Sequence, residues 1–263
     1  MSLSTSPVSL LMAGPVVTIT ADTLLDAAYK VLVERRVSAL PVVDTQGRPL
    51  GVLSETDLLR AGRMQPMSLA GVQVLDLPSE PVAQHMHAGV VTATADTSVR
   101  ECAKLLGERR IHRVYITKDN ALAGVFSTEE VLIALREERI GTPIVEVMTN
   151  PVSTIHFHAP VSEAAARLDH AGIGGLAVVD ENGHPVGMFT KSEALKARNV
   201  ATDTKVEDVM SYGMLYQNSR TPLFRAAAHA YETGTRRVLV MEDRRLAGIL
   251  TGLDFARLLG GQS

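Results

Sequence analysis

Hydrophobic positions along the chain change their spacing in a fixed order. A β-branched run, VVTIT (16–20), comes first, and apolar residues then recur at helical spacing at Leu25, Ala28 and Leu32. A continuous apolar run, LPVVD (40–44), follows and leads through a polar turn into a strand that begins with glycine and a second helix. The pattern predicts the element order β-α-β-β-α.

Two short markers show that this order returns three more times. The first is a glycine, two apolar residues and a hydroxyl residue, found at 51–54, 124–127, 187–190 and 248–251. The second is a methionine, found at Met12, Met86, Met148 and Met210, with intervals that match those of the glycines. We therefore predict four repeats, over residues 8–62, 82–138, 144–198 and 206–260.

The length of one repeat indicates that the repeats pack in pairs. A unit of about 60 residues buries little surface and is only marginally stable by itself. The extra residues between the first two repeats, about 63–84, contain three prolines and are expected to form a linker or a surface excursion.

Composition narrows the class of protein. Hydrophobic residues make up 46% of the 263 residues and charged residues 21%, as in a globular domain. Aromatic residues are only 4%, with no Trp, so the platforms on which single-stranded nucleic acids stack are lacking. The net charge of −3 gives no electrostatic footprint for DNA or an anionic membrane.

The number of cysteines and the length of the apolar runs indicate in which cellular compartment the protein is expected. A single cysteine, Cys102, excludes an intrachain disulfide and fits a reducing environment. No apolar run approaches the 18 residues of a membrane-spanning helix. We expect a soluble cytoplasmic protein with no nucleic-acid or membrane partner.

With its PVVD-like strands and its glycine phrase extended to S/T-x-x-D/E, the chain resembles the cystathionine β-synthase (CBS) domain family. The resemblance covers residues 8–260 and implies a mixed α/β (α+β) fold of four CBS repeats paired into two Bateman modules. Four such repeats with nothing else attached are similar to the γ subunit of AMP-activated protein kinase and its stand-alone prokaryotic relatives.

The S/T-x-x-D/E phrase has a purely structural explanation. It is a capping box, in which the hydroxyl and the carboxylate each satisfy backbone N–H groups at a helix start. All four repeats fit it, with the pairs Ser54 and Asp57, Ser127 and Glu130, Thr190 and Glu193, and Thr251 and Asp254. Capping alone would explain the phrase without any ligand.

The same geometry also suits a nucleotide. A helix start offers N–H groups to a phosphate, the hydroxyl adds a donor, and a short carboxylate one turn later accepts the two hydroxyls of a ribose. Capping boxes are usually written with Glu or Gln. The aspartates of repeats one and four, Asp57 and Asp254, are therefore the stronger candidates for ligand binding.

The resemblance implies the same roles for individual residues. Asp57 and Asp254 would hold the ribose, and Ser54 and Thr251 would touch phosphate. The residues implied for the adenine slot are Thr18, Leu40 and Pro41 in repeat one, with Val17, and Met214 and Val238 in repeat four, with Leu215.

Basic residues before the central strands indicate which ligand is bound. Repeat two has His112 and Arg113 and repeat four has Arg236 and Arg237, where repeats one and three have Ala39-Leu40 and Gly175-Leu176. Solvated surface charge is one explanation. In the resembling family, basic pairs here face phosphates, which favours AMP, ADP or ATP, alone or with Mg²⁺, over S-adenosylmethionine.

Catalysis and metal binding have little support in the sequence. The repeats use almost the whole chain, and neither a phosphate-binding P-loop nor a G-x-S-x-G nucleophile motif is present. The histidine pairs at 85 and 87 and at 156 and 158 lack a cysteine or acid pattern that would complete a zinc site.

We therefore expect a regulatory nucleotide sensor, not an enzyme, that controls a partner protein the sequence does not identify. A scaffold with empty clefts and a binder of another adenosyl ligand, such as S-adenosylmethionine, are the alternatives. Whether the chain forms a homodimer is left open.

Overall fold

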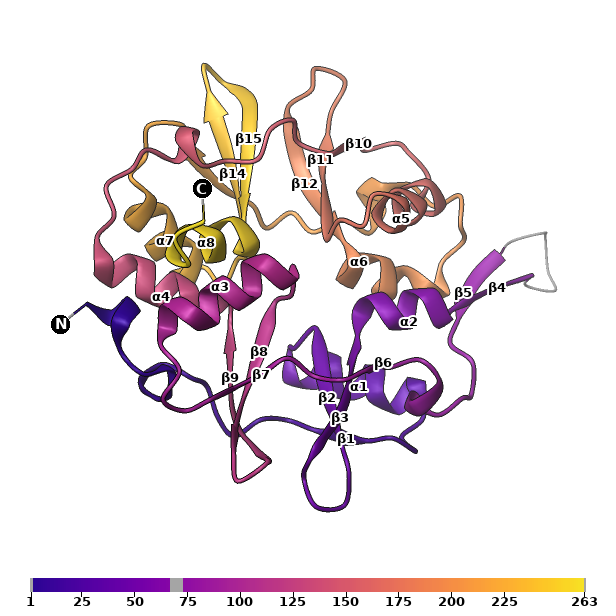
Figure 1. Cartoon of the computed structure of the whole chain (residues 1–263). Coiled ribbons are helices and arrows are strands. Elements are labelled where there is room, and N and C mark those ends of the chain that lie inside the picture. Colours follow the sequence, from indigo (N-terminus) through magenta and orange to yellow (C-terminus); the bar gives the residue numbers. More distant parts are fainter. Residues whose placement is uncertain (1, 67–72, 263) are drawn as a thin grey trace. The chain divides into compact units, whose positions relative to one another are not determined.

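The computed structural model describes residues 2–66 and 73–262, and the order β-α-β-β-α occurs four times in them (Figure 1). Repeat one comprises β1 (Ile19–Thr20), α1 (Leu25–Arg35), β2 (Ala39–Val43), β3 (Pro49–Ser54) and α2 (Glu55–Ala61). Repeat two comprises β7 (Thr92–Thr94), α3 (Val99–Arg109), β8 (Arg113–Lys118), β9 (Ala121–Ser127) and α4 (Thr128–Glu138). The predicted mixed α/β fold is confirmed.

The second half of the chain repeats the same elements. Repeat three comprises β10 (Thr154–His156), α5 (Val161–His170), β11 (Gly175–Val179), β12 (Pro185–Thr190) and α6 (Lys191–Lys196). Repeat four comprises β13 (Leu215–Asn218), α7 (Leu223–Glu232), β14 (Arg237–Glu242), β15 (Arg245–Thr251) and α8 (Gly252–Leu259).

Each repeat builds a small sheet around its second strand. The first strand runs parallel to the second, and the third runs antiparallel to it. A parallel pair requires a crossover, which the first helix of the repeat supplies. In repeat one this helix buries Leu25, Ala28 and Leu32, the three residues that predicted it. The central strand is also buried, and its Leu40 and Val42 are wholly inaccessible.

Within each predicted range, a short leading segment stands ahead of the β-α-β-β-α elements of the repeat and packs on a different repeat from the one it leads into. These segments contain the 3₁₀ turns η2 (Val8–Leu10), η3 (Val82–Gln84), η4 (Ile144–Glu146) and η6 (Val206–Asp208). Val8, ahead of repeat one, lies in the core of repeat two with Val99. Val82, ahead of repeat two, lies in the core of repeat one with Leu25. Repeats one and two therefore exchange their leading segments.

Repeats three and four make the same exchange. Thr149, ahead of repeat three, pairs with Ile249 of repeat four, and Ser211, ahead of repeat four, pairs with Met188 of repeat three. The exchange thus involves repeats one and two and repeats three and four, in agreement with two Bateman modules.

The two sequence markers meet in this exchange. The marker methionine of each segment lies on the marker glycine of the other repeat of its pair, in the contacts Met12 to Gly124, Met86 to Gly51, Met148 to Gly248 and Met210 to Gly187. A Cβ added to Gly124 would come within 2.6 Å of the Met12 sulfur. The glycines are needed because the methionine occupies the space of a side chain.

The chain divides into two compact units, which are described separately. One comprises the described parts of residues 1–16, 90–152 and 214–263, and the other comprises residues 17–89 and 153–213. In the first unit, the helices of repeats two and four share one core that includes Phe126, Leu223 and Phe255. In the second unit, α2 of repeat one packs on α6 of repeat three (Figure 1).

The expected linker at 63–84 is only partly a linker. Strands β4 (Arg63–Pro66) and β5 (Gln73–Asp76) form an antiparallel pair, and residues 67–72 lie outside the described residues. Leu77 and Val82 are buried in the core of repeat one, and β6 (His87–Ala88) joins the edge of its sheet. Residues 77–84 therefore belong to the exchanged segment. Within the described chain, no helix is long and apolar enough to cross a membrane.

We predict that Gly51→Ala destabilises the protein by about 1–3 kcal/mol, as overpacking does in a close-packed interior. The added Cβ would collide with the backbone carbonyl oxygen of His87, which cannot rotate away. Urea unfolding measures the change. Gly141→Ala is the matched control, since its Cβ meets open space. Equal stability of both variants would contradict the packing explanation.

Candidate functional site

The carboxylates that end the four S/T-x-x-D/E phrases all cap the helices that they begin. These phrase carboxylates are Asp57, Glu130, Glu193 and Asp254. In each repeat one carboxylate oxygen accepts the backbone N–H of the hydroxyl residue three positions earlier. For Asp57 the Ser54 N–H and hydroxyl donate to Oδ2 at 2.8 and 2.6 Å. For Asp254 the Thr251 N–H and hydroxyl donate to Oδ2, both at 2.7 Å. Capping therefore does not separate Asp from Glu.

Burial of these carboxylates is also uniform. The exposed fractions of Asp57, Glu130, Glu193 and Asp254 lie between 5% and 8%. Burial raises the pKa of Glu130 above its ordinary value, against the hydrogen bonds from Ser127 that lower it. Each carboxylate is thus held in a nearly dry position by its own helix start.

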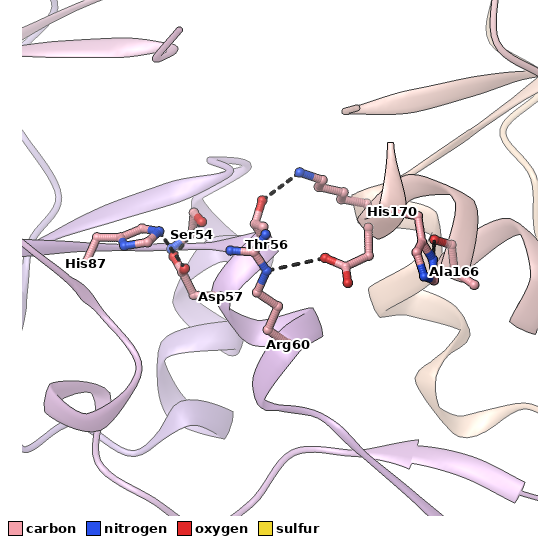
Figure 2. Close-up of polar contacts among 9 residues, drawn as sticks. Ser54, Thr56, Asp57, Arg60, His87, Ala166 and His170 are labelled. Atoms are coloured by element: carbon pink, nitrogen blue, oxygen red, sulfur yellow. Dashed lines mark hydrogen bonds and ion pairs between the residues drawn. The ribbon is translucent and has the colours of Figure 1, made fainter. Parts of the chain in front are cut away.

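The second carboxylate oxygen is what distinguishes the repeats. Oδ1 of Asp57 lies 3.4 Å from Nε2 of His87, which reaches it from the exchanged segment (Figure 2). Oδ1 of Asp254 accepts a hydrogen bond from the Thr149 hydroxyl at 3.1 Å and lies 3.8 Å from Arg257. The sequence analysis considered His87 only as a metal ligand and did not single out Thr149. Both directly follow a marker methionine, and that shared position was the available signal.

The strand register places the two basic pairs at equivalent positions of their repeats, but their counterparts in repeats one and three lie one residue earlier than the sequence predicted. Arg113 pairs with Ser127 across the sheet and Arg237 pairs with Thr251, as Ala39 pairs with Ser54. The counterparts of the basic pairs are therefore Ser38-Ala39 and Gly174-Gly175, so the predicted correspondence with Leu40 and Leu176 is wrong. Directly opposed residues share one face of the sheet. Each arginine thus stands beside the hydroxyl that caps its helix.

Both basic pairs lie in one compact unit, and the helix starts beside them touch. A Cβ on Gly252, the first residue of α8, would lie 2.6 Å from the Cβ of Thr128, the first residue of α4. The Thr128 N–H also donates to the carbonyl of His112 at 3.4 Å. Two helix starts and the basic residues of repeats two and four therefore converge.

The helix starts of the other unit are occupied by the protein's own polar groups. Lys191 of α6 donates to the Thr56 hydroxyl of α2 at 2.8 Å, and Ser192 donates to Glu55. Arg60 of α2 pairs with Asp169 of α5 at 3.3 Å (Figure 2). These contacts tie repeats one and three together by polar bonds.

The residues implied for the adenine slot differ in accessibility. Leu40 and Val238 are wholly buried in hydrophobic cores, and Pro41 is buried, so their side chains are closed to a ligand. Thr18 is exposed, and Met214 is half-buried with its sulfur accepting from Tyr216 at 3.2 Å. Val17 and Leu215 are also half-buried, so four of the slot residues, Thr18, Met214, Val17 and Leu215, keep accessible surface.

The histidines and the cysteine have local structural partners. His85 pairs with Glu80 at 2.7 Å, and His156 and His158 both lie against the ring of Phe157. Over residues 2–66 and 73–262, no group of three or more His, Cys, Asp or Glu side chains is placed to hold a metal. Burial raises the pKa of the Cys102 thiol to about 12, which keeps it protonated.

Comparison with known proteins gives relatives of the same architecture. MJ1225 of Methanocaldococcus jannaschii, put forward as an archaeal homologue of g-AMPK, is 22% identical over 65% of this chain and 68% of its own length. Its crystal structure gives a TM-score of 0.81, at 19% identity, over 96% of this chain and 99% of that one. A Pyrococcus horikoshii protein gives a TM-score of 0.67 at 18% identity, over 96% of this chain and 99% of that one.

A longer relative and a family model complete the comparison. MJ1404 of Methanocaldococcus jannaschii is 26% identical over 96% of this chain, but the match spans only 62% of that protein. Three segments, residues 8–63, 82–137 and 144–199, match the model of the CBS domain. These segments hold more than half of the chain, and the described structure repeats their element order a fourth time. The chain belongs to the CBS domain family.

Proposed function

We propose that this protein is a regulatory sensor of adenine nucleotides (AMP, ADP or ATP, with or without Mg²⁺) that controls a partner protein. Nucleotide would favour one arrangement of the modules over another. A ligand shifts such an equilibrium only by its difference in affinity for the two states.

The observation that carries the proposal is the convergence in the unit of repeats two and four. The starts of α4 and α8 meet there, beside the strand starts that hold Arg113 and Arg237. Helix starts favour anions by about 0.3–1 kcal/mol each when exposed, and more when partly buried. Arginine adds charge-assisted hydrogen bonds to phosphate oxygens. This combination suits a phosphorylated ligand.

The carboxylates supply the complement for the sugar. Asp254 lies one turn into α8, in the same unit as the basic residues, and Asp57 has the equivalent place in repeat one. A carboxylate that accepts two hydroxyls selects a ribose over a simple phosphate. CBS domain pairs commonly bind adenosyl ligands and regulate partners, and the proposal extends this property to the present chain.

S-adenosylmethionine is the second candidate ligand. It would use the same ribose carboxylates, but its cationic sulfonium would lie near a basic cluster, which disfavours it electrostatically. A scaffold without any ligand is the remaining alternative. Native mass spectrometry of the purified protein separates the three, because carried-over ligand is identified by its mass. An enzyme would be recognised by product after long incubation with ATP.

We expect replacement of both Arg236 and Arg237 by Ala to weaken AMP binding on the order of tenfold or more, as loss of bonds to a charged group does. The salt dependence of binding should also become flatter, because a phosphate contact is screened by salt. Adenosine, which lacks phosphate, should be affected much less. Calorimetric titration at two ionic strengths measures both effects.

Replacement of Arg244 and Arg245 by Ala is the control for charge. Arg244 and Arg245 lie at the turn between β14 and β15, whereas Arg237 begins β14. This variant therefore also loses two positive charges, but at a distance from the start of α8. Equal losses for AMP and adenosine would show that Arg236 and Arg237 support the fold instead of a phosphate.

The four phrase carboxylates should separate into two classes. Asp57→Ala and Asp254→Ala are expected to weaken nucleotide binding by about 1.5–3 kcal/mol, since each removes an acceptor for the ribose. Glu130→Ala and Glu193→Ala should leave affinity nearly unchanged, because the longer side chain places its carboxylate where the ribose would lie. All four should lose about 0.5–2 kcal/mol of stability with the helix cap.

Calorimetry and thermal unfolding of the four variants test this separation. Equal affinity losses for Asp and Glu variants would mean that all four clefts hold ligand. If all four variants melt at a lower temperature but bind nucleotide with unchanged affinity, the S/T-x-x-D/E phrase serves only as a helix cap.

A further inference from the structure

The acceptor capacity of Asp57 and Asp254 is almost filled by the protein itself. A carboxylate has about four lone-pair positions, two on each oxygen. In both residues Oδ2 accepts two hydrogen bonds from the capping residue. Oδ1 of Asp57 faces His87, and Oδ1 of Asp254 accepts from Thr149. One acceptor position remains on Asp57, and the one that remains on Asp254 is on the oxygen that also lies 3.8 Å from Arg257, whereas a ribose diol needs two.

Backbone pairing fixes the two residues that face Oδ1. His87 pairs with Val52 on the edge of the repeat-one sheet. Thr149 exchanges two hydrogen bonds with Ile249, of 2.8 and 3.0 Å, in repeat four. Each residue follows a methionine that lies on a marker glycine. The exchanged segment therefore places the backbone of each of these residues beside its aspartate.

The two glutamate repeats lack this arrangement. The equivalent residues are Ala13 and Ser211, which pair with Val125 and Met188. Alanine has no polar side chain, and the Ser211 hydroxyl accepts from the Gly213 N–H at 3.3 Å. Thus a donor from the exchanged segment stands at Oδ1 only where the phrase ends in Asp, within residues 2–66 and 73–262.

We propose that His87 and Thr149 are specificity-determining residues that compete with the ribose diol for Oδ1 of Asp57 and Asp254. The proposal rests on the proposed function, because it concerns the same carboxylates. A ligand with both sugar hydroxyls must move His87 or Thr149 aside, and a ligand without the diol has no need to.

The competition would also connect ligand binding to the next repeat. Each exchanged segment continues directly into the other compact unit, at residues 89–90 and 152–153. Displacing His87 or Thr149 therefore acts on the segment that leads into repeat two or repeat three. In this way ligand binding at the carboxylate would favour one arrangement of the modules, provided that the ligand binds the two arrangements with different affinity.

The test compares AMP with 2′,3′-dideoxy-AMP by calorimetric titration. His87→Ala should tighten AMP binding about twofold to fivefold, the range of an exposed ion pair. Thr149→Val should tighten it about threefold to tenfold, in line with a hydrogen bond of ordinary strength. Neither should change the affinity for dideoxy-AMP. Thr149→Ser, which keeps the hydroxyl, should bind AMP like the wild type, as should Ser211→Ala.

Each result has a definite meaning. Weaker or unchanged AMP binding by both His87→Ala and Thr149→Val overturns the competition, and so does equal tightening of AMP and dideoxy-AMP. A wild type that binds none of AMP, ADP and ATP overturns the proposed function and this inference together. Binding by the wild type with unaltered variants overturns this inference alone. If Thr149→Val does not fold, His87→Ala decides the outcome: AMP binding that is not tightened relative to dideoxy-AMP overturns the competition.

Discussion

The contact between a glycine and a methionine of an exchanged segment is the constraint on which the rest of the structure depends. At four places a methionine occupies the space where a side chain would stand on the third strand of the sheet. Glycine leaves room for that approach, and the residue after each methionine pairs with the residue after the glycine. It thereby links tandem repeats and decides which side chain stands next to the helix-start carboxylate.

The carboxylates combine a structural and a proposed functional role on different oxygens. One oxygen of each closes the capping box and is committed to the fold. The other is free to differ, and it faces His87, Thr149 or Lys196 according to the repeat. A helix cap contributes on the order of 1 kcal/mol, so any ligand function of these residues is coupled to stability.

The two compact units share the same arrangement of elements but differ in the residues at their helix starts. Where repeats one and three meet, Lys191 and Ser192 bind Thr56 and Glu55, so the helix starts are joined by internal polar bonds. Where repeats two and four meet, Gly252 and Thr128 make a small, close contact with arginines beside the capping hydroxyls. The first arrangement holds helices together, and the second gathers positive charge near helix starts.

The sequence by itself determined the element order, the four repeats and the capping boxes, because strand and helix periodicity and caps depend on neighbours a few residues apart. Only the tertiary structure decided where the leading segments pack, since a methionine marker does not specify which glycine it contacts. It also decided the strand register, which moved the equivalents of Arg113 and Arg237 by one residue. The contacts of Oδ1 with His87 and Thr149 were likewise decided by the tertiary structure, because these residues lie 30 and 105 positions from Asp57 and Asp254. Contacts across such distances depend on how the sheets assemble, which no local pattern encodes.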